Sequence, residues 1–113
     1  AQARAEVRNV NLSKELEDYL VELIMVTRDP SAYDKNLVAK IAYGASPRGT
    51  IALDKCAKAN AWLEGRDFVT PYDIHEVIYN VLRHRIILNF EALSEGMTPD
   101  DVIKRILSLV PVP

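Results

Sequence analysis

Four stretches of the chain carry apolar residues at the spacing of an amphipathic helix. In the first, which follows Ser13, they recur at i, i+3, i+4, i+7 and i+8, and most charged residues lie elsewhere: Leu16, Tyr19, Leu20, Leu23 and Ile24. Ser13 is a suitable N-cap for this helix. The turn residues Asp29-Pro30-Ser31 predict its end near Arg28, since the residue before a proline avoids helical angles.

The second helix is expected to run from Pro47 to about Glu64 and to close at Gly65. Its apolar arc is wide and rich in alanine, with one stripe of Ala52, Cys56, Ala59 and Leu63 and an adjoining stripe of Leu53, Ala57 and Ala61. Small side chains let neighbouring helices approach, so we expect this helix at the centre of a bundle, with Trp62 as a large anchor near its end. On this pattern Cys56 is a small core residue rather than a nucleophile.

Two further helices begin with a cap residue followed by proline. Thr70-Pro71 precedes Ile74, Val77, Ile78, Val81 and Leu82, a helix that ends around the basic trio Arg83-His84-Arg85. Thr98-Pro99 precedes Val102, Ile103, Ile106, Leu107 and Val110, and the terminal prolines stop this last helix. The chain therefore reads as an all-α fold, a small bundle of about four to five helices.

The connections between these helices are less clearly determined. Residues 29 to 45 form a long connection whose middle, 36 to 43, suits a short helix or turn. Short extended segments are expected at residues 9 to 12 and 66 to 69, and the pattern leaves open whether they pair into a minor two-stranded β element. The run Ile86-Ile87-Leu88 is too short for its period to separate helix from strand.

Composition limits the classes of function. A chain of 113 residues is one domain, and its net charge of −2 gives no basic field for nucleic acid or an anionic membrane. The single cysteine excludes an internal disulfide and a cysteine-based zinc site and suits the cytoplasm. No apolar run approaches the roughly 20 residues of a membrane span, and the first residues lack the apolar core of a signal peptide.

Several candidate chemistries are absent or have a simpler explanation. Neither G-x-x-x-x-G-K-[ST] nor G-x-G-x-x-G occurs, so the chain cannot hold ATP and magnesium in the P-loop manner. His75 and His84 are too far apart for a helical metal pair, and we expect no metal site. Asp100 and Asp101 lie in the first turn of a helix, where acids suit the dipole. The trio Arg83-His84-Arg85 fits either the end of a helix or an interface.

Arg48 is the most unusual charged residue by position. Ser46 can cap the second helix and Pro47 fits its first position, so Arg48 lies in the first turn. The dipole makes a cation there unfavourable by a few tenths of a kcal/mol unless an anion such as phosphate joins it. The alternative is an arginine that bends back to a carboxylate or extends into water, and the residues alone favour it.

An ordered set of motifs resembles the C-terminal helical lid domain of the MoxR family of AAA+ ATPases. The segments that carry the resemblance are Thr27-Arg28, Tyr43-Gly44-Ala45-Ser46-Pro47-Arg48, Gly65-Arg66-Asp67-Phe68-Val69-Thr70-Pro71 with Asp73, and Val81-Leu82-Arg83-His84-Arg85. Gln2 to Val10 resembles the end of the ATPase core where it runs into the lid. Residues 1–10 are therefore expected to be a linker from the core, and residues 11–113 the helical lid.

The resemblance implies a role for Arg48 as the sensor-2 arginine, which reaches the γ-phosphate of ATP, with Ser46 and Pro47 beside it in the nucleotide site. Magnesium and the Walker motifs belong to the core domain, so the chain is not expected to hydrolyse ATP alone. The implied partners are the core of the same chain, neighbouring subunits of a ring oligomer, and client protein complexes of a chaperone-like motor. Gly49 departs from the family, which usually has alanine there.

A rival interpretation is a helical module that binds a protein or DNA and has no ATPase role. Its best support is Arg83-His84-Arg85 together with Lys104 and Arg105. Its weakness is the acidic balance of the chain and the lack of a basic recognition helix, which makes nucleic acid an unexpected partner.

Overall fold

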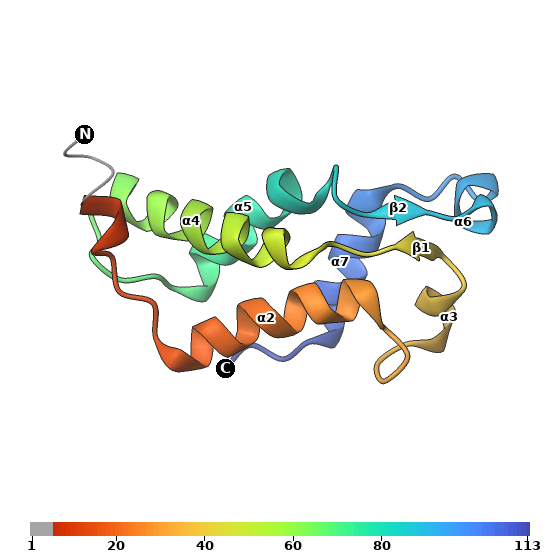
Figure 1. Cartoon of the computed structure of the whole chain (residues 1–113), viewed down its shortest axis with the longest axis horizontal. Coiled ribbons are helices and arrows are strands. Elements are labelled where there is room, and N and C mark those ends of the chain that lie inside the picture. Colours follow the sequence, from red (N-terminus) through yellow and green to blue (C-terminus); the bar gives the residue numbers. More distant parts are fainter. Residues whose placement is uncertain (1–5) are drawn as a thin grey trace.

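The computed structural model describes residues 6–113, which form an elongated helical domain with a small β element near one end (Figure 1). Its principal extents are 46 × 26 × 20 Å. The elements are α2 (Lys14–Arg28), α3 (Lys35–Val38), β1 (Ile41–Tyr43), α4 (Pro47–Leu63), α5 (Pro71–Leu82), β2 (Ile87–Leu88), α6 (Phe90–Ser94) and α7 (Pro99–Leu109). The fold is all-α with a minor β element, as predicted.

Local capping chemistry sets the ends of the long helices. The Ser13 side chain accepts a hydrogen bond from Leu16 N at 3.3 Å and starts α2, which ends before Asp29 and Pro30. At the start of α7, Thr98 and Asp101 form a reciprocal capping box, and Thr70 and Asp73 do the same for α5. These signals are local in sequence, so the predicted bounds of the four main helices are confirmed to within a residue or two.

The most extensive contact in the core joins α4 to α5. The side of α4 that is buried carries small residues and one leucine: Gly49, Leu53, Ala57 and Ala61. The adjoining stripe, expected to be buried as well, is not: Cys56 is exposed and Leu63 is 75% exposed. The prediction that Cys56 is a core residue is therefore wrong. Alanine and cysteine are so weakly apolar that the pattern did not distinguish the buried side of α4 from its neighbour.

A two-stranded antiparallel sheet pairs β1 with β2, with Ile41 opposite Leu88 and Tyr43 opposite Ile87. Ile87-Leu88 is thus a strand, and the segment 36 to 43, expected to hold a short helix or turn, divides into α3 and β1. The other two extended segments meet in a single parallel bridge, where Asn11 N donates to Asp67 O at 2.8 Å and Val69 N donates to Asn11 O at 2.9 Å.

The short helix α6 was not predicted. Asn89 caps it by accepting a hydrogen bond from Ala92 N at 3.1 Å. Lys40, which lies just before β1, bonds Glu91 at 3.2 Å and Glu95 at 2.6 Å. A helix of five residues is too short to show an apolar period, and α6 depends on these contacts with a distant segment, so the sequence pattern could not predict it.

The proposed linker, residues 1–10, lies partly outside the described residues, which begin at residue 6. Within the described part, residues 6–8 are helical and Val10 is buried. Trp62 Nε1 donates to Glu6 Oε2 at 3.0 Å, so this segment contacts the end of α4. The assignment of residues 1–10 as a linker from another domain stays a prediction.

A buried ion pair ties the end of α4 to the start of α5. Asp73 is fully buried, and its carboxylate accepts hydrogen bonds from the two terminal nitrogens of Arg66, at 2.6 and 3.0 Å. Asn60 Nδ2 at 2.8 Å and Thr70 N at 2.7 Å complete its shell. The segment from Gly65 to Asp73 that resembled a family motif therefore has a structural role: it fixes the corner between the two central helices.

Replacement of Arg66 by methionine is expected to lower the free energy of unfolding by about 3 kcal/mol, because the Asp73 carboxylate would stay buried without its charged partner. Thermal and denaturant unfolding of the chain measure this loss. Lys14→Met breaks the exposed pair of Lys14 with Asp18 and serves as the control, with no expected change in Tm. A Tm for Arg66→Met equal to that of the control contradicts the assigned role.

His75 on α5 and Tyr19 on α2 form a second link within the core. The Tyr19 hydroxyl lies 2.8 Å from His75 Nε2, and the two rings meet edge to face with centroids 6.0 Å apart. Burial lowers the pKa of His75 below its ordinary 6.5, because desolvation disfavours the imidazolium.

Because the pKa of His75 is lowered, the folded protein binds a proton on this imidazole less tightly than the unfolded chain does. The free energy of unfolding is therefore expected to fall as the pH drops below about 6.5. The aspartates whose pKa is lowered by hydrogen bonds, Asp29, Asp34 and Asp100, lose their contribution only below their ordinary 3.8. His75→Gln is expected to flatten the dependence of Tm on pH between 7.5 and 5.5. If Tm of His75→Gln changes with pH as steeply as Tm of the wild type, His75 is not the source of the pH dependence.

Candidate functional site

The loop that leads into α4 is held against the end of α2. A Cβ atom placed on Gly44 would lie 2.2 Å from the carbonyl oxygen of Thr27 and 2.6 Å from the backbone N of Arg28. Both are backbone atoms, which cannot move away as a side chain could. Only glycine therefore lets the loop lie this close to α2. Gly44 thus fixes how closely the loop lies to α2, and Figure 1 shows the segment between β1 and α4 passing the end of that helix.

The Thr27 hydroxyl binds the same loop. It accepts a hydrogen bond from Ala45 N at 2.9 Å and donates to Ile24 O at 2.6 Å, and both Thr27 and Ala45 are fully buried. A buried N–H without an acceptor is costly, so this hydroxyl holds the loop in one position. In the sequence, Thr27 stands out only through the Thr27-Arg28 segment that carries the family resemblance, and the helical pattern did not indicate that its hydroxyl holds a loop.

Ser46 and Pro47 start α4 as predicted. Ser46 has extended backbone angles, its Oγ accepts a hydrogen bond from Arg48 N at 3.3 Å, and Pro47 is the first helical residue. Arg48 follows Ser46 by two residues and lies in the first turn of α4. The structure therefore brings Ser46, Pro47 and Arg48 together at one helix start.

The Arg48 side chain is exposed, and its guanidinium makes no hydrogen bond or ion pair with any residue in the described range 6–113. Other arginines behave differently: Arg66, Arg83 and Arg105 each bond an aspartate. The alternative in which Arg48 bends back to a carboxylate of this domain is thereby removed. A cation at the positive end of a helix dipole is left to face solvent or an outside partner.

Gly49, the residue that departs from the family, lies where α4 meets the preceding loop and α2. A Cβ atom on it would be 3.2 Å from Ala45 Cβ and 3.4 Å from Ile24 Cδ1. The glycine is buried, so it lets the first turn of α4 lie against the loop and α2. The departure from alanine thus affects packing beside Arg48 and leaves the arginine in place.

The other candidate residues have structural contacts. Arg83 bonds Asp100 through two nitrogens at 2.8 and 2.9 Å, which joins the end of α5 to the start of α7, and Arg85 Nε donates to Val81 O at 3.1 Å. Asp101 is the acidic member of a capping box. Among residues 6–113, no three His, Cys, Asp or Glu side chains are placed so that together they could hold a metal ion.

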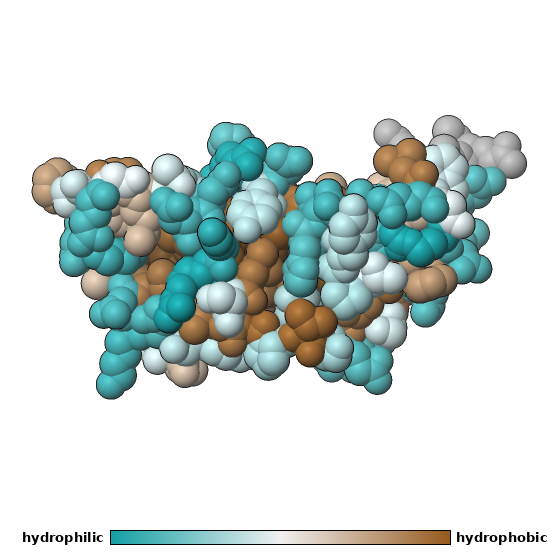
Figure 2. Space-filling model, turned by 180° about the vertical axis from the view of Figure 1, so that it is seen from behind, coloured by the Kyte–Doolittle hydropathy of each residue, from teal (hydrophilic) through white to brown (hydrophobic). Residues whose placement is uncertain are grey.

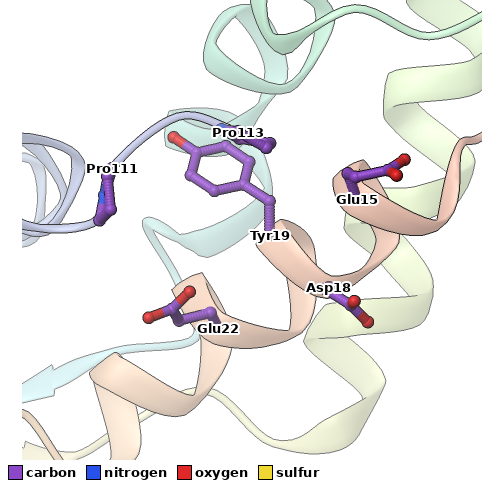
Figure 3. A pocket seen from close by; sticks show the side chains of 6 residues that line it. All are labelled: Glu15, Asp18, Tyr19, Glu22, Pro111 and Pro113. Atoms are coloured by element: carbon purple, nitrogen blue, oxygen red, sulfur yellow. The ribbon is translucent and has the colours of Figure 1, made fainter.

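A shallow hollow elsewhere on the molecule was not predicted. It lies between α2 and the C-terminal segment and is lined by three carboxylates, a tyrosine and two prolines: Glu15, Asp18, Glu22, Tyr19, Pro111 and Pro113 (Figure 3). Its α2 lining ends at Glu22, whereas the loop before α4 lies against the last turn of that helix. Its negative charge makes it unsuitable for a phosphate group.

Large apolar side chains are exposed around β1, β2 and α6: Tyr43, Ile87, Phe90 and Leu93. In the view from behind, hydrophobic residues reach the surface at this end of the molecule and also along its middle (Figure 2). Apolar surface of this kind is typical of contact with another protein surface. Within the described part of the chain, no helix combines the length and apolar character needed to cross a membrane.

Comparison with known proteins gives a consistent result. Residues 37–106 match the family described as the AAA lid domain. The chain is 41% identical over 99 residues to Chaperone MoxR1 of Mycobacterium tuberculosis, which covers 87% of this chain and 26% of that protein. It is 42% identical over 72 residues to Protein MoxR of Methylorubrum extorquens, covering 62% of this chain and 21% of that protein.

A solved structure agrees with these relatives. The crystal structure of a "putative ATPase" from Cytophaga hutchinsonii superposes with a TM-score of 0.92 and 44% identity, over 96% of this chain and 33% of that one. The chain thus spans between about a fifth and a third of the length of these proteins. With the family match, the fold and the MoxR relatives in agreement, the chain belongs to the AAA lid domain family, as the lid of a MoxR-type AAA+ ATPase.

Proposed function

We propose that this lid takes part in ATP binding and hydrolysis by the full-length ATPase, and that Arg48 is its sensor-2 arginine, in contact with the γ-phosphate. The observation that carries the proposal is the state of Arg48: an exposed guanidinium without a partner in residues 6–113, at a helix start fixed by Thr27 and Gly44.

The residues of this site fit a phosphate group. An arginine offers forked donors that match phosphate oxygens, and the positive end of the α4 dipole adds to the potential that attracts an anion. Ser46 and Pro47 set where that turn begins. ATP would supply the transferable phosphoryl group and the core domain would hold Mg²⁺, while this chain contributes a fixed positive charge that stabilises the negative charge of the transferring group.

The proposed consequence of this contact is a shift of the lid toward a closed position over the nucleotide. A ligand moves such an equilibrium only by binding one state better than the other, and a γ-phosphate contact from Arg48 provides that difference. The exposed apolar end around β1, β2 and α6 supports contact with a core domain or a neighbouring subunit of a ring oligomer. The full-length protein would then act in the cytoplasm as a chaperone-like motor on client complexes.

The rival proposal of a DNA- or protein-binding module loses much of its support. Arg83 and Arg85 bond within the domain and Arg105 bonds Asp34 at 2.9 Å, so three of its proposed contact residues are already engaged. The net charge of −2 adds no attraction to nucleic acid.

Arg48→Ala in the full-length ATPase is expected to slow ATP turnover by at least about tenfold, because a positive charge aimed at the transferring phosphoryl group is lost. Steady-state phosphate release measures this rate. Lys55→Ala removes an exposed cation of the same helix and is the matched control, with wild-type turnover expected. The isolated chain is expected to give no turnover. A full-length Arg48→Ala protein as active as the control refutes the sensor role.

Thr27→Val tests how Arg48 is positioned. Valine has nearly the same shape as threonine but leaves the buried Ala45 N–H without an acceptor, so the free energy of unfolding is expected to fall by about 1–3 kcal/mol. ATP turnover of the full-length protein is expected to fall too, since the loop before Arg48 is released. Thr50→Val removes a hydroxyl that makes no hydrogen bond with residues 6–113 and should change neither quantity. Wild-type turnover in Thr27→Val would show that the loop needs no such support.

A further inference from the structure

Arg28, the last residue of α2, is the second arginine of interest. Its side chain is exposed, and like Arg48 its guanidinium has no hydrogen bond or ion pair with any residue that the structure describes. Arg66, Arg83 and Arg105 bond carboxylates, and Arg85 bonds a backbone carbonyl. Arg28 and Arg48 are thus distinguished from these four by leaving all their donors available.

The two arginines flank the same fixed loop. The backbone N of Arg28 lies 2.6 Å from the position of a Cβ on Gly44, so Arg28 is next to the loop, and Arg48 follows that loop in the first turn of α4. The adjacent Thr27 hydroxyl bonds Ala45 N at 2.9 Å, which prevents the two segments from separating without loss of a buried hydrogen bond.

Helix geometry directs Arg28 toward the same end of the site. Ile24 packs against the first turn of α4, with its Cδ1 3.4 Å from a Cβ position on Gly49. Arg28 follows Ile24 by four residues, so it continues the same face of α2 by one turn. Ile24 on this face lies beside Gly49 in α4, whereas Arg28 lies beside Gly44, which precedes the first residue of α4. This explains why Arg28 is exposed although its helix face is the buried one.

We propose that Arg28 is a second phosphate-binding residue, which contacts the same triphosphate as Arg48. The proposal rests on the proposed function of Arg48. A guanidinium offers several donors in a fixed plane, and a triphosphate has enough oxygens to bind two such groups at once. With the two backbones held on one loop, both side chains would move with the lid as a unit. The competing explanation is a solvated cation that merely suits the C-terminal end of the α2 dipole.

Nucleotide affinity of the full-length ATPase separates these explanations. Dissociation constants for a non-hydrolysable ATP analogue and for ADP would be measured by titration calorimetry for wild type, Arg28→Ala, Arg48→Ala and the double variant. Lys35→Ala removes another exposed cation and serves as the control. Arg28→Lys keeps the charge but not the forked donors. Tm of each variant, measured without nucleotide, reports any loss of fold.

Arg28→Ala is expected to weaken binding of the ATP analogue by roughly tenfold or more with an unchanged Tm, since each charge-assisted hydrogen bond can contribute that much. Arg28→Lys should recover part of the loss. In the double variant the loss should differ from the product of the two single losses, because both groups bind one ligand.

If Arg28→Ala binds both nucleotides as wild type does while Arg48→Ala loses affinity for the ATP analogue, this inference is overturned and the proposed function stands. If neither variant changes affinity or turnover, both fail. A loss of affinity in Arg28→Ala accompanied by an equal fall of Tm would assign Arg28 a structural role and also overturn the inference.

Discussion

The position of the proposed nucleotide-binding arginines depends on one buried hydroxyl and one missing side chain. The Thr27 hydroxyl satisfies the N–H of Ala45, and Gly44 lets the loop lie directly on the backbone of α2. Neither interaction involves the exposed guanidinium groups of the two arginines. Both are needed because a loop pressed against a helix must bury polar backbone groups, and each such group needs a partner. The end of α2 and the start of α4 are thereby joined at a single point.

The opposite end of α4 is fixed by a different kind of interaction. There the buried carboxylate of Asp73 holds Arg66, Asn60 and the start of α5 together. Between the two ends, the small residues of α4 let α5 approach closely along its length. A helix that is anchored at both ends and packed along one side responds to a force at its first turn as a rigid unit. This supports the proposal that a phosphate contact at Arg48 is passed on to the rest of the lid.

The charges of α2 are separated along its length. Glu15, Asp18 and Glu22 line the hollow beside the C-terminal segment, whereas the last residue of the helix is Arg28. The helix dipole favours this order, because it stabilises acidic side chains near the start of a helix and a basic side chain at its end. The separation leaves positive charge at the end that adjoins the loop before Arg48. It keeps the acidic hollow away from the site proposed for a triphosphate.

Wherever the determining chemistry is local, the sequence by itself was sufficient. The caps at Ser13, Ser46, Thr70 and Thr98 and the apolar spacing after each located the four main helices. The cap at Ser46 also placed Arg48 in the first turn of its helix. Tertiary structure alone decided which stripe of α4 is buried, that Ile41–Tyr43 pairs with Ile87–Leu88, and that α6 forms. It also decided that Arg66 meets Asp73 while Arg28 and Arg48 meet no carboxylate of residues 6–113. These outcomes depend on contacts between segments far apart in the chain, which neither helical period nor cap chemistry encodes.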